Sequence, residues 1–97
     1  MTFEELRQEI YRIKMDIAYN KTNNDILVKL DVEVESLLND VNYELGTGWY
    51  RNELYNELWG YKTDLILLNK RIYANRCVNK YSKEWLKNTC TDLYESL

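Results

Sequence analysis

Nothing else in this sequence restricts the fold as strongly as the stretch from Trp49 to Val78. It contains no proline, and its apolar residues recur at alternating spacings of four and three, which is typical of an amphipathic α-helix. The first stripe is Leu54, Leu58, Tyr61, Leu65, Leu68 and Ile72. A second stripe beside it is Tyr55, Trp59, Ile66 and Tyr73. We therefore predict a helix of about 45 Å that packs against neighbours on more than one side. It either overhangs those neighbours or bends, and Gly60 is where a bend costs least.

The scarcity of turn residues predicts helices in the rest of the chain too. The 97 residues include no proline and three glycines, whereas all-β folds need such residues at their turns. Thr2, followed by Glu5 three residues later, forms a capping box that predicts a first helix from Phe3 to Tyr19. The polar run over 20–24 then predicts a loop.

Residues 26–35 are compatible with two structures. Val28, Leu30, Val32 and Val34 alternate with charged residues, which is a strand pattern. The same segment fits a helix with the apolar stripe Leu27, Leu30, Val34, Leu37, Val41 and Leu45. No second alternating run is present to pair with a strand, and a lone strand leaves its backbone groups unsatisfied. We therefore predict a helix from about Asp25 to Leu45.

Two further breaks complete the predicted organisation. Gly46 suits the end of the second helix, and Thr47 suits the start of the third. Ser82 is a good N-cap for a final helix that runs to Leu97. Short connections between four amphipathic helices predict antiparallel neighbours. The predicted fold is all-α, an antiparallel up-down four-helix bundle with a long third helix, in a single domain over residues 1–97.

Charge is unevenly distributed along the chain. The net charge is −3, but residues 1–48 carry 5 basic and 10 acidic side chains, whereas residues 49–97 carry 8 and 6. Within 70–87, six basic residues face one acid, Glu84. These six are Lys70, Arg71, Arg76, Lys80, Lys83 and Lys87. This basic end is the main electrostatic feature of the sequence.

Carboxylates are plentiful, but the histidine and cysteine that zinc sites and many nucleophilic enzymes use are absent or few. The chain has no histidine, and its two cysteines, Cys77 and Cys90, make neither a zinc site nor a disulfide framework. We find no glycine-rich phosphate loop and no nucleophile–base pair. The opening Leu6-Arg7 resembles the first helix of the helical chorismate mutases, but the acidic second helix lacks the cations that such a dicarboxylate site needs. We predict a non-enzymatic protein with no cofactor and no metal.

Aromatic residues point instead to a binding surface. Nine tyrosines and three tryptophans exceed what the core of a small bundle needs, and such residues are typical interface anchors at a surface. The residues that we predict to bind a partner are Tyr55, Trp59, Arg71, Tyr73, Arg76, Lys80, Tyr81 and Trp85. Three alternatives remain open for the basic end. It binds nucleic acid, it binds an acidic protein surface or the anionic cytoplasmic face of a membrane protein, or it pairs with the acidic half inside the bundle. A pI near 5.0 disfavours a dedicated nucleic-acid binder.

The chain resembles the cytosolic immunity proteins for pediocin-like bacteriocins. The residues that carry the resemblance are the capped first helix, Asp25-Ile26-Leu27 with Leu30, Tyr43-Glu44-Leu45 before a glycine, and Tyr81-Ser82 at the start of the last helix. The predicted third helix is about three turns longer than the family pattern gives. The resemblance implies protection by contact, with recognition of a sugar-transporter receptor complexed with the toxin at the inner membrane face. It also implies that the carboxy-terminal half carries specificity.

We thus predict a small protein that acts by protein–protein contact, as a bacteriocin-immunity or inhibitor protein. The amino terminus is neither a signal nor a transit peptide, and no apolar run approaches a membrane span, so we expect a cytoplasmic location. One alternative is a phage-type inhibitor of a host enzyme or defence complex. Others are a homodimer formed through the long helix and a nucleic-acid or nucleotide-binding module that uses the basic end.

Overall fold

The computed structural model describes residues 2–47 and 52–97, and all regular structure in these residues is helical. The helices are α1 (Phe3–Tyr19), α2 (Asn24–Thr47), α3 (Asn52–Lys80), α4 (Lys83–Thr89) and α5 (Thr91–Glu95). The predicted all-α class and the long third helix are confirmed. The predicted start of the third helix at Trp49 lies outside the described residues.

α1 begins and ends where the sequence predicts. The Oγ1 of Thr2 accepts a hydrogen bond of 3.1 Å from the backbone N–H of Glu5, so the N-cap satisfies one of the free donors of the first turn. The helix buries one stripe, Leu6, Ile10, Ile13 and Ile17.

α2 settles the ambiguity of residues 26–35 in favour of the helix. Its buried residues are Leu27, Leu30, Val34, Leu37 and Val41, which share a helical face. Val28 and Val32, which a strand would have placed beside Leu30 and Val34, are exposed. The helix also runs past Gly46, so the predictions of a C-cap at Gly46 and an N-cap at Thr47 are wrong. Thr47 instead donates its hydroxyl to the carbonyl of Glu44 at 2.8 Å, a bond that belongs to the last turn of α2.

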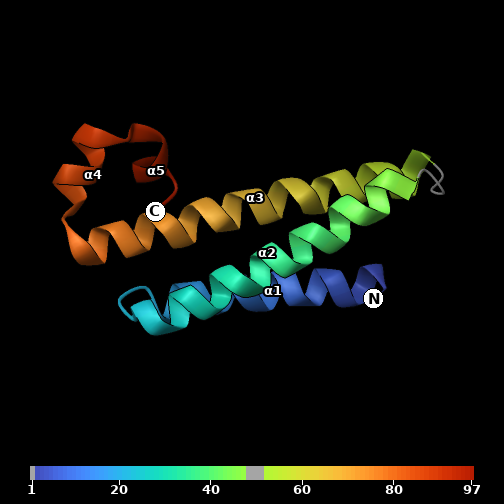
Figure 1. The fold of residues 1–97 in the computed structure, drawn as a ribbon, viewed down its shortest axis with the longest axis horizontal. Helices are drawn as coiled ribbons and strands as arrows, with labels where there is room; N and C mark the ends of the chain where they lie inside the picture. The colour runs from blue at the N-terminus through green and yellow to red at the C-terminus, as the bar shows by residue number, and fades with distance from the viewer. Residues whose placement is uncertain (1, 48–51) are drawn as a thin grey trace.

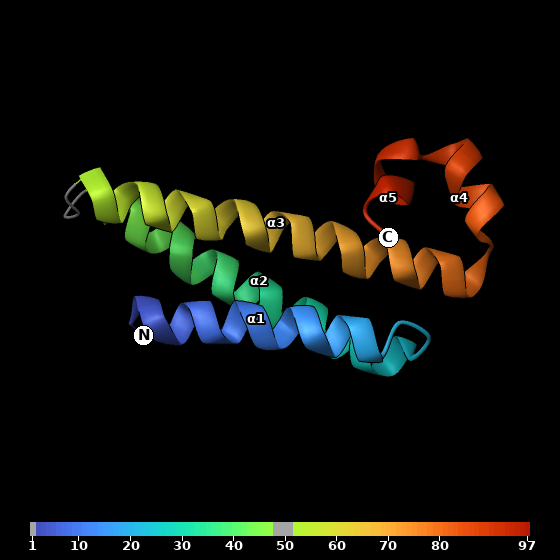
Figure 2. The ribbon, with the colours of Figure 1, turned by 180° about the vertical axis from the view of Figure 1, so that it is seen from behind.

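α1, α2 and α3 run up and down and share one hydrophobic core (Figure 1). α3 supplies Leu58, Tyr61, Leu65, Leu68 and Ile72 to that core, and it continues without a break through Gly60. It extends past α1 at both ends, as Figures 1 and 2 show. The overhang that the sequence allowed is therefore present.

The last two helices, α4 and α5, form a hook that folds back on α3. Among the described elements they contact α3 and each other, on the side of α3 away from α1 (Figures 1 and 2). Ala74 and Leu86 are buried but lie outside the main core. The hook is tied to α3 by an ion pair of 3.0 Å between Lys70 and Asp92.

The final helix that the sequence predicts is interrupted at Cys90. Cys90 has extended backbone angles, φ −149° and ψ 92°, and separates α4 from α5. The run Asn88-Thr89-Cys90-Thr91 consists of poor helix formers, so a break there costs little. The break lets the chain turn back onto α3. A straight helix starting at Ser82 would instead point away from α3.

Candidate functional site

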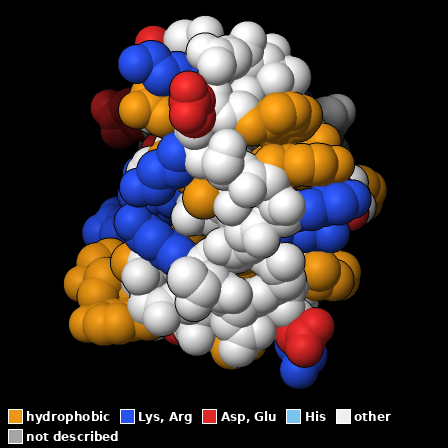
Figure 3. Space-filling view, turned by 90° about the vertical axis from the view of Figure 1, so that its left-hand side faces the viewer, with side chains coloured by type: hydrophobic (Ala, Val, Ile, Leu, Met, Phe, Trp, Pro, Cys, Tyr) orange, Lys and Arg blue, Asp and Glu red, His pale blue; other side chains and the backbone are white. Residues whose placement is uncertain are grey.

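Five of the eight predicted partner residues lie at one end of the molecule, where α3 ends and α4 begins. A groove of about 510 Å³ lies there, lined by Asn24, Tyr73, Arg76, Cys77, Asn79, Lys80 and Tyr81. Figure 3 looks at this end, where lysine and arginine side chains stand on both sides of an uncharged strip and few acids are visible. We define the C-terminal surface as this groove together with Lys83 and Trp85.

Helical spacing arranges the groove residues of α3 in two adjacent stripes. Tyr73, Cys77 and Tyr81 follow each other at intervals of four, and so do Arg76 and Lys80. An apolar and aromatic stripe therefore runs beside a cationic one for the last two turns of the helix. The N-terminal end of α2 closes the groove through Asn24.

The aromatic side chains of the C-terminal surface are open to solvent. Tyr73 is 54% exposed, Tyr81 51% and Trp85 41%. The Tyr81 and Trp85 rings stack with centroids 4.2 Å apart and an interplanar angle of 23°. Ser82 holds this geometry, because its Oγ accepts a hydrogen bond of 3.0 Å from the backbone N–H of Trp85 and starts α4. The stack is thus an exposed platform with a fixed orientation.

The cations of the basic end fall into two groups. Arg76 lies 4.0 Å from Asp31 of α2, so it takes part in the internal pairing with the acidic half. Lys80, Lys83 and Lys87 have no ion-pair partner among residues 2–47 and 52–97. The Lys80 Nζ lies 5.3 Å from the centre of the Tyr81 ring, a cation–π contact. Internal pairing therefore accounts for only part of the basic end.

Asn79 fixes the groove to the rest of the bundle. Its Nδ2 donates to the carbonyl of Lys21 and to the Oδ1 of Asn24, both at 2.7 Å. These bonds join the end of α3 to the α1–α2 loop and to the start of α2, and so link the two walls of the groove. Sequence reasoning missed Asn24 and Asn79, and the one signal for them was their place at helix ends, where asparagine favours capping bonds.

Five of the eight predicted partner residues lie on the C-terminal surface: Tyr73, Arg76, Lys80, Tyr81 and Trp85. Arg71 does not, because its Nε donates to the carbonyl of Ser96 at 3.4 Å and helps to hold the hook. Tyr55 and Trp59 form a separate exposed pair, with ring centroids 6.2 Å apart. Trp59 and Tyr73 are about 21 Å apart along the helix axis, so the structure does not bring these two sets together.

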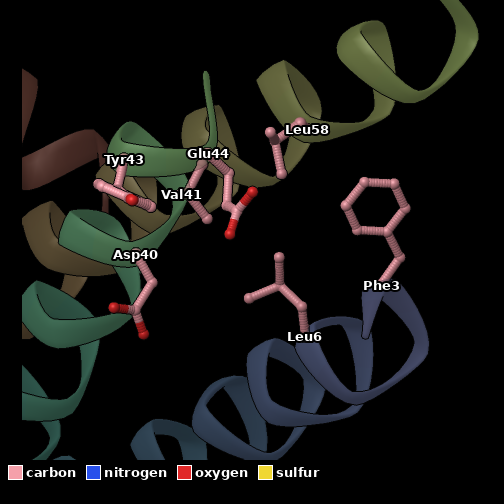
Figure 4. Close-up of a pocket in the computed structure, with 7 residues that line it drawn as sticks. All are labelled: Phe3, Leu6, Asp40, Val41, Tyr43, Glu44 and Leu58. Carbon is pink, nitrogen blue, oxygen red and sulfur yellow. The ribbon is translucent and has the colours of Figure 1, made fainter. Parts of the chain in front are cut away.

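A second, smaller groove of about 290 Å³ lies at the opposite end. It opens between the start of α1 and the α2–α3 pair, and Figure 4 shows the Glu44 carboxylate of α2 facing the apolar side chains of Leu6 and Leu58. The lining residues are Phe3, Leu6, Asp40, Val41, Tyr43, Glu44 and Leu58. The two grooves therefore differ in chemistry, since this one is acidic and that of the C-terminal surface is basic.

The pKa values of Tyr61 in α3 and of Arg12 in α1 are shifted from their ordinary values. Tyr61 donates its hydroxyl to the Oε1 of Glu57 at 2.7 Å, and burial, then this hydrogen bond, raise the pKa of Tyr61 above its ordinary value. Hydrogen bonds to Glu9 and Glu33 raise the pKa of Arg12 further above its already high value. The structure contains no cluster of three or more histidine, cysteine, aspartate or glutamate side chains suited to a metal ion within its described part.

No protein-family model matches this chain, and no solved structure matches it. A stretch of 34 residues, 35% of the chain, is 44% identical to a protein of Evansella cellulosilytica named "Putative membrane protein". The match spans 5% of the length of that protein. In the chain itself, none of the described helices has the length and hydropathy that crossing a membrane requires.

Proposed function

We propose that this chain is a non-enzymatic cytoplasmic protein that acts by protein–protein contact, as an inhibitor or immunity protein. The C-terminal surface is its contact site. The observation that carries this proposal is the convergence of exposed Tyr73 and Tyr81 with the unpaired Lys80 on one groove, beside which Trp85 stacks on Tyr81. Exposed tyrosine and tryptophan are among the side chains that most often anchor protein interfaces.

Two properties of the C-terminal surface support a protein partner. First, the Tyr81–Trp85 stack and the Asn79 bonds hold its residues in place before binding, which lowers the entropy cost of association. Second, the cations are few and lie beside an apolar stripe, as at the core and rim of a protein interface. The resemblance to bacteriocin-immunity proteins, which Tyr81-Ser82 just before α4 helps to carry, adds the expectation that the partner lies at the inner membrane face.

An affinity capture with paired variants tests this proposal. The tagged chain is incubated with lysate and with membranes of the host cell, in parallel with Tyr81→Ala/Trp85→Ala and with Tyr11→Ala/Tyr19→Ala. The second variant also removes two exposed tyrosines, but from α1. We expect the same protein to be captured by wild type and by the α1 variant, and to be lost with the C-terminal variant.

Three results would contradict the proposal. Equal capture by the Tyr81→Ala/Trp85→Ala variant would place the contact elsewhere. Capture that a nuclease abolishes would favour a nucleic-acid-binding protein. Capture of further copies of the chain alone, lost with Tyr55→Ala/Trp59→Ala, would favour a homodimer through α3.

A further inference from the structure

We infer that the partner meets the C-terminal surface with an acidic amphipathic helix of about two to three turns. Its carboxylates lie over Lys80 and Lys83, and one of its apolar side chains enters the groove beside Tyr73. This inference rests on the proposed function, because it names the chemistry of the partner at the same site.

The spacing of the two stripes is the first argument. From Tyr73 to Tyr81 the groove extends for about 12 Å along α3. Arg76, which pairs with Asp31, and Lys80 are four residues apart, about 6 Å along the axis, and Lys83 follows Lys80 by three residues. A partner helix offers carboxylates at the same interval when they are four residues apart, with an apolar stripe directly beside them. One helix facing another thus matches cation to carboxylate and aromatic to apolar side chain.

The charge on the hook is the second argument. Lys83 and Lys87 are four residues apart on α4, an arrangement of like charges that is mildly unfavourable in a helix. Neither has an ion-pair partner among the described residues. The Lys87 Nζ instead lies 5.8 Å from the centre of the Tyr94 ring. Carboxylates of a partner would relieve the repulsion, and charge complementarity of this kind also speeds association.

The acidic residues near the groove favour a short helix over nucleic acid. Asp31 lies 4.0 Å from Arg76, and Glu84 stands between Lys83 and Trp85 in α4. The whole chain carries a net charge of −3, which repels a long polyanion. A helix with two or three carboxylates can place each charge over a lysine and avoid these acids, whereas a continuous phosphate backbone cannot.

The test uses synthetic peptides against the full chain. The probe peptide is a capped helix of about four turns with glutamates at intervals of four beside a leucine stripe. A second peptide has the same composition, but its glutamates are spread around the helix. An oligothymidylate of equal charge is the third probe. Calorimetric titration gives the dissociation constant of each for wild type and variants, and circular dichroism confirms that each variant is folded.

Matched variants separate a specific site from general attraction. We expect the probe peptide to bind, and Lys80→Glu/Lys83→Glu to weaken it on the order of tenfold or more. Lys14→Glu/Lys29→Glu makes the same change in net charge at exposed positions outside the surface and should leave binding unchanged. Lys80→Gln/Lys83→Gln should give an intermediate loss.

The inference would be overturned if the two peptides bound equally well, or if the oligothymidylate bound more tightly than the probe peptide. It would also be overturned if the control variant weakened peptide binding as much as Lys80→Glu/Lys83→Glu. If no peptide binds while Tyr81→Ala/Trp85→Ala still abolishes capture of the partner, the acidic helix is wrong and the proposed contact function stands. If capture is also insensitive to that variant, both fail.

Discussion

The side-chain amide of Asn79 donates a hydrogen bond of 2.7 Å to the backbone carbonyl of Lys21, 58 residues earlier in the chain. A second bond of the same length reaches the Oδ1 of Asn24. Asn79 therefore joins the last turn of α3 to the loop between α1 and α2. Because the groove of the C-terminal surface has walls from both parts, this one side chain positions the site without being part of its charged or aromatic stripes.

Replacing Asn79 should weaken the structure and the site together. We expect Asn79→Ala to lower the free energy of unfolding by about 1 kcal/mol, since a net hydrogen bond of this kind contributes about 0.5–1.5 kcal/mol and this one is exposed. Asn56→Ala, at an exposed position of α3, is the control. Urea unfolding measures both, and equal stability of the two variants would show that the bonds to the loop contribute nothing.

The hook and the three-helix core should respond differently to cavities. Leu65 is fully buried in the main core, so Leu65→Ala should lower the global free energy of unfolding by about 2–5 kcal/mol. Leu86 belongs to α4 and is buried outside the main core, so Leu86→Ala should mainly speed amide hydrogen exchange in α4 and α5. Equal acceleration of exchange in α1 and in the hook by Leu86→Ala would mean that the two parts unfold as one unit.

Tyr61 should make stability depend on pH in alkaline solution. Burial and the bond to Glu57 favour the neutral phenol, so the pKa of Tyr61 is higher in the folded state than in the unfolded chain. Its contribution is then complete below about pH 10 and is lost as the pH rises through the folded pKa. Tyr61→Phe should be less stable than wild type by about 0.5–1.5 kcal/mol at neutral pH. The gap should narrow above about pH 10, whereas Tyr19→Phe, at an exposed position, should show no such convergence.

Arg12 joins α1 to α2 through a cluster of carboxylates. It makes ion pairs with Glu9 at 2.9 Å, Asp16 at 2.8 Å and Glu33 at 2.6 Å, and all four side chains are partly exposed. Because solvent screens such pairs, Arg12→Gln should cost about 1 kcal/mol in low salt and less in about 1 M salt. Lys14→Gln, at an exposed neighbouring position, is the control. A loss that does not change with salt would show that Arg12 acts by packing.

The periodic parts of the fold could be predicted from the sequence because the burial pattern determines them locally. The stripe from Leu6 to Ile17 and the N-caps Thr2 and Ser82 specify where α1 and α4 lie, whatever the tertiary structure. The ambiguous residues 26–35 became helical because only a helix puts Leu27, Leu30 and Val34 on one face. Gly46 misled the prediction because α2 continues through it by one residue, to Thr47.

The parts that depend on contacts far apart in the sequence could not be predicted in the same way. The spacing of Leu86, Cys90 and Leu93 does not indicate that the backbone is extended at Cys90 and that the chain folds back on α3. Likewise, the sequence pattern grouped Tyr55 and Trp59 with Tyr73, although these residues lie far apart along α3. The pattern also could not show that Arg71 donates a hydrogen bond to the carbonyl of Ser96. Helical spacing did indicate that Tyr73, Arg76 and Lys80 line one groove, because they lie within two turns.

Hydrogen–deuterium exchange of the chain with and without its captured partner tests the central claim most directly. If the C-terminal surface is the contact site, amides over 73–87 become protected on binding while those over 53–62, around Tyr55 and Trp59, exchange as in the free chain. The assignment of the contact site would be contradicted if exchange over 73–87 were unchanged and protection were confined to 53–62 or to the acidic groove near Phe3 and Asp40.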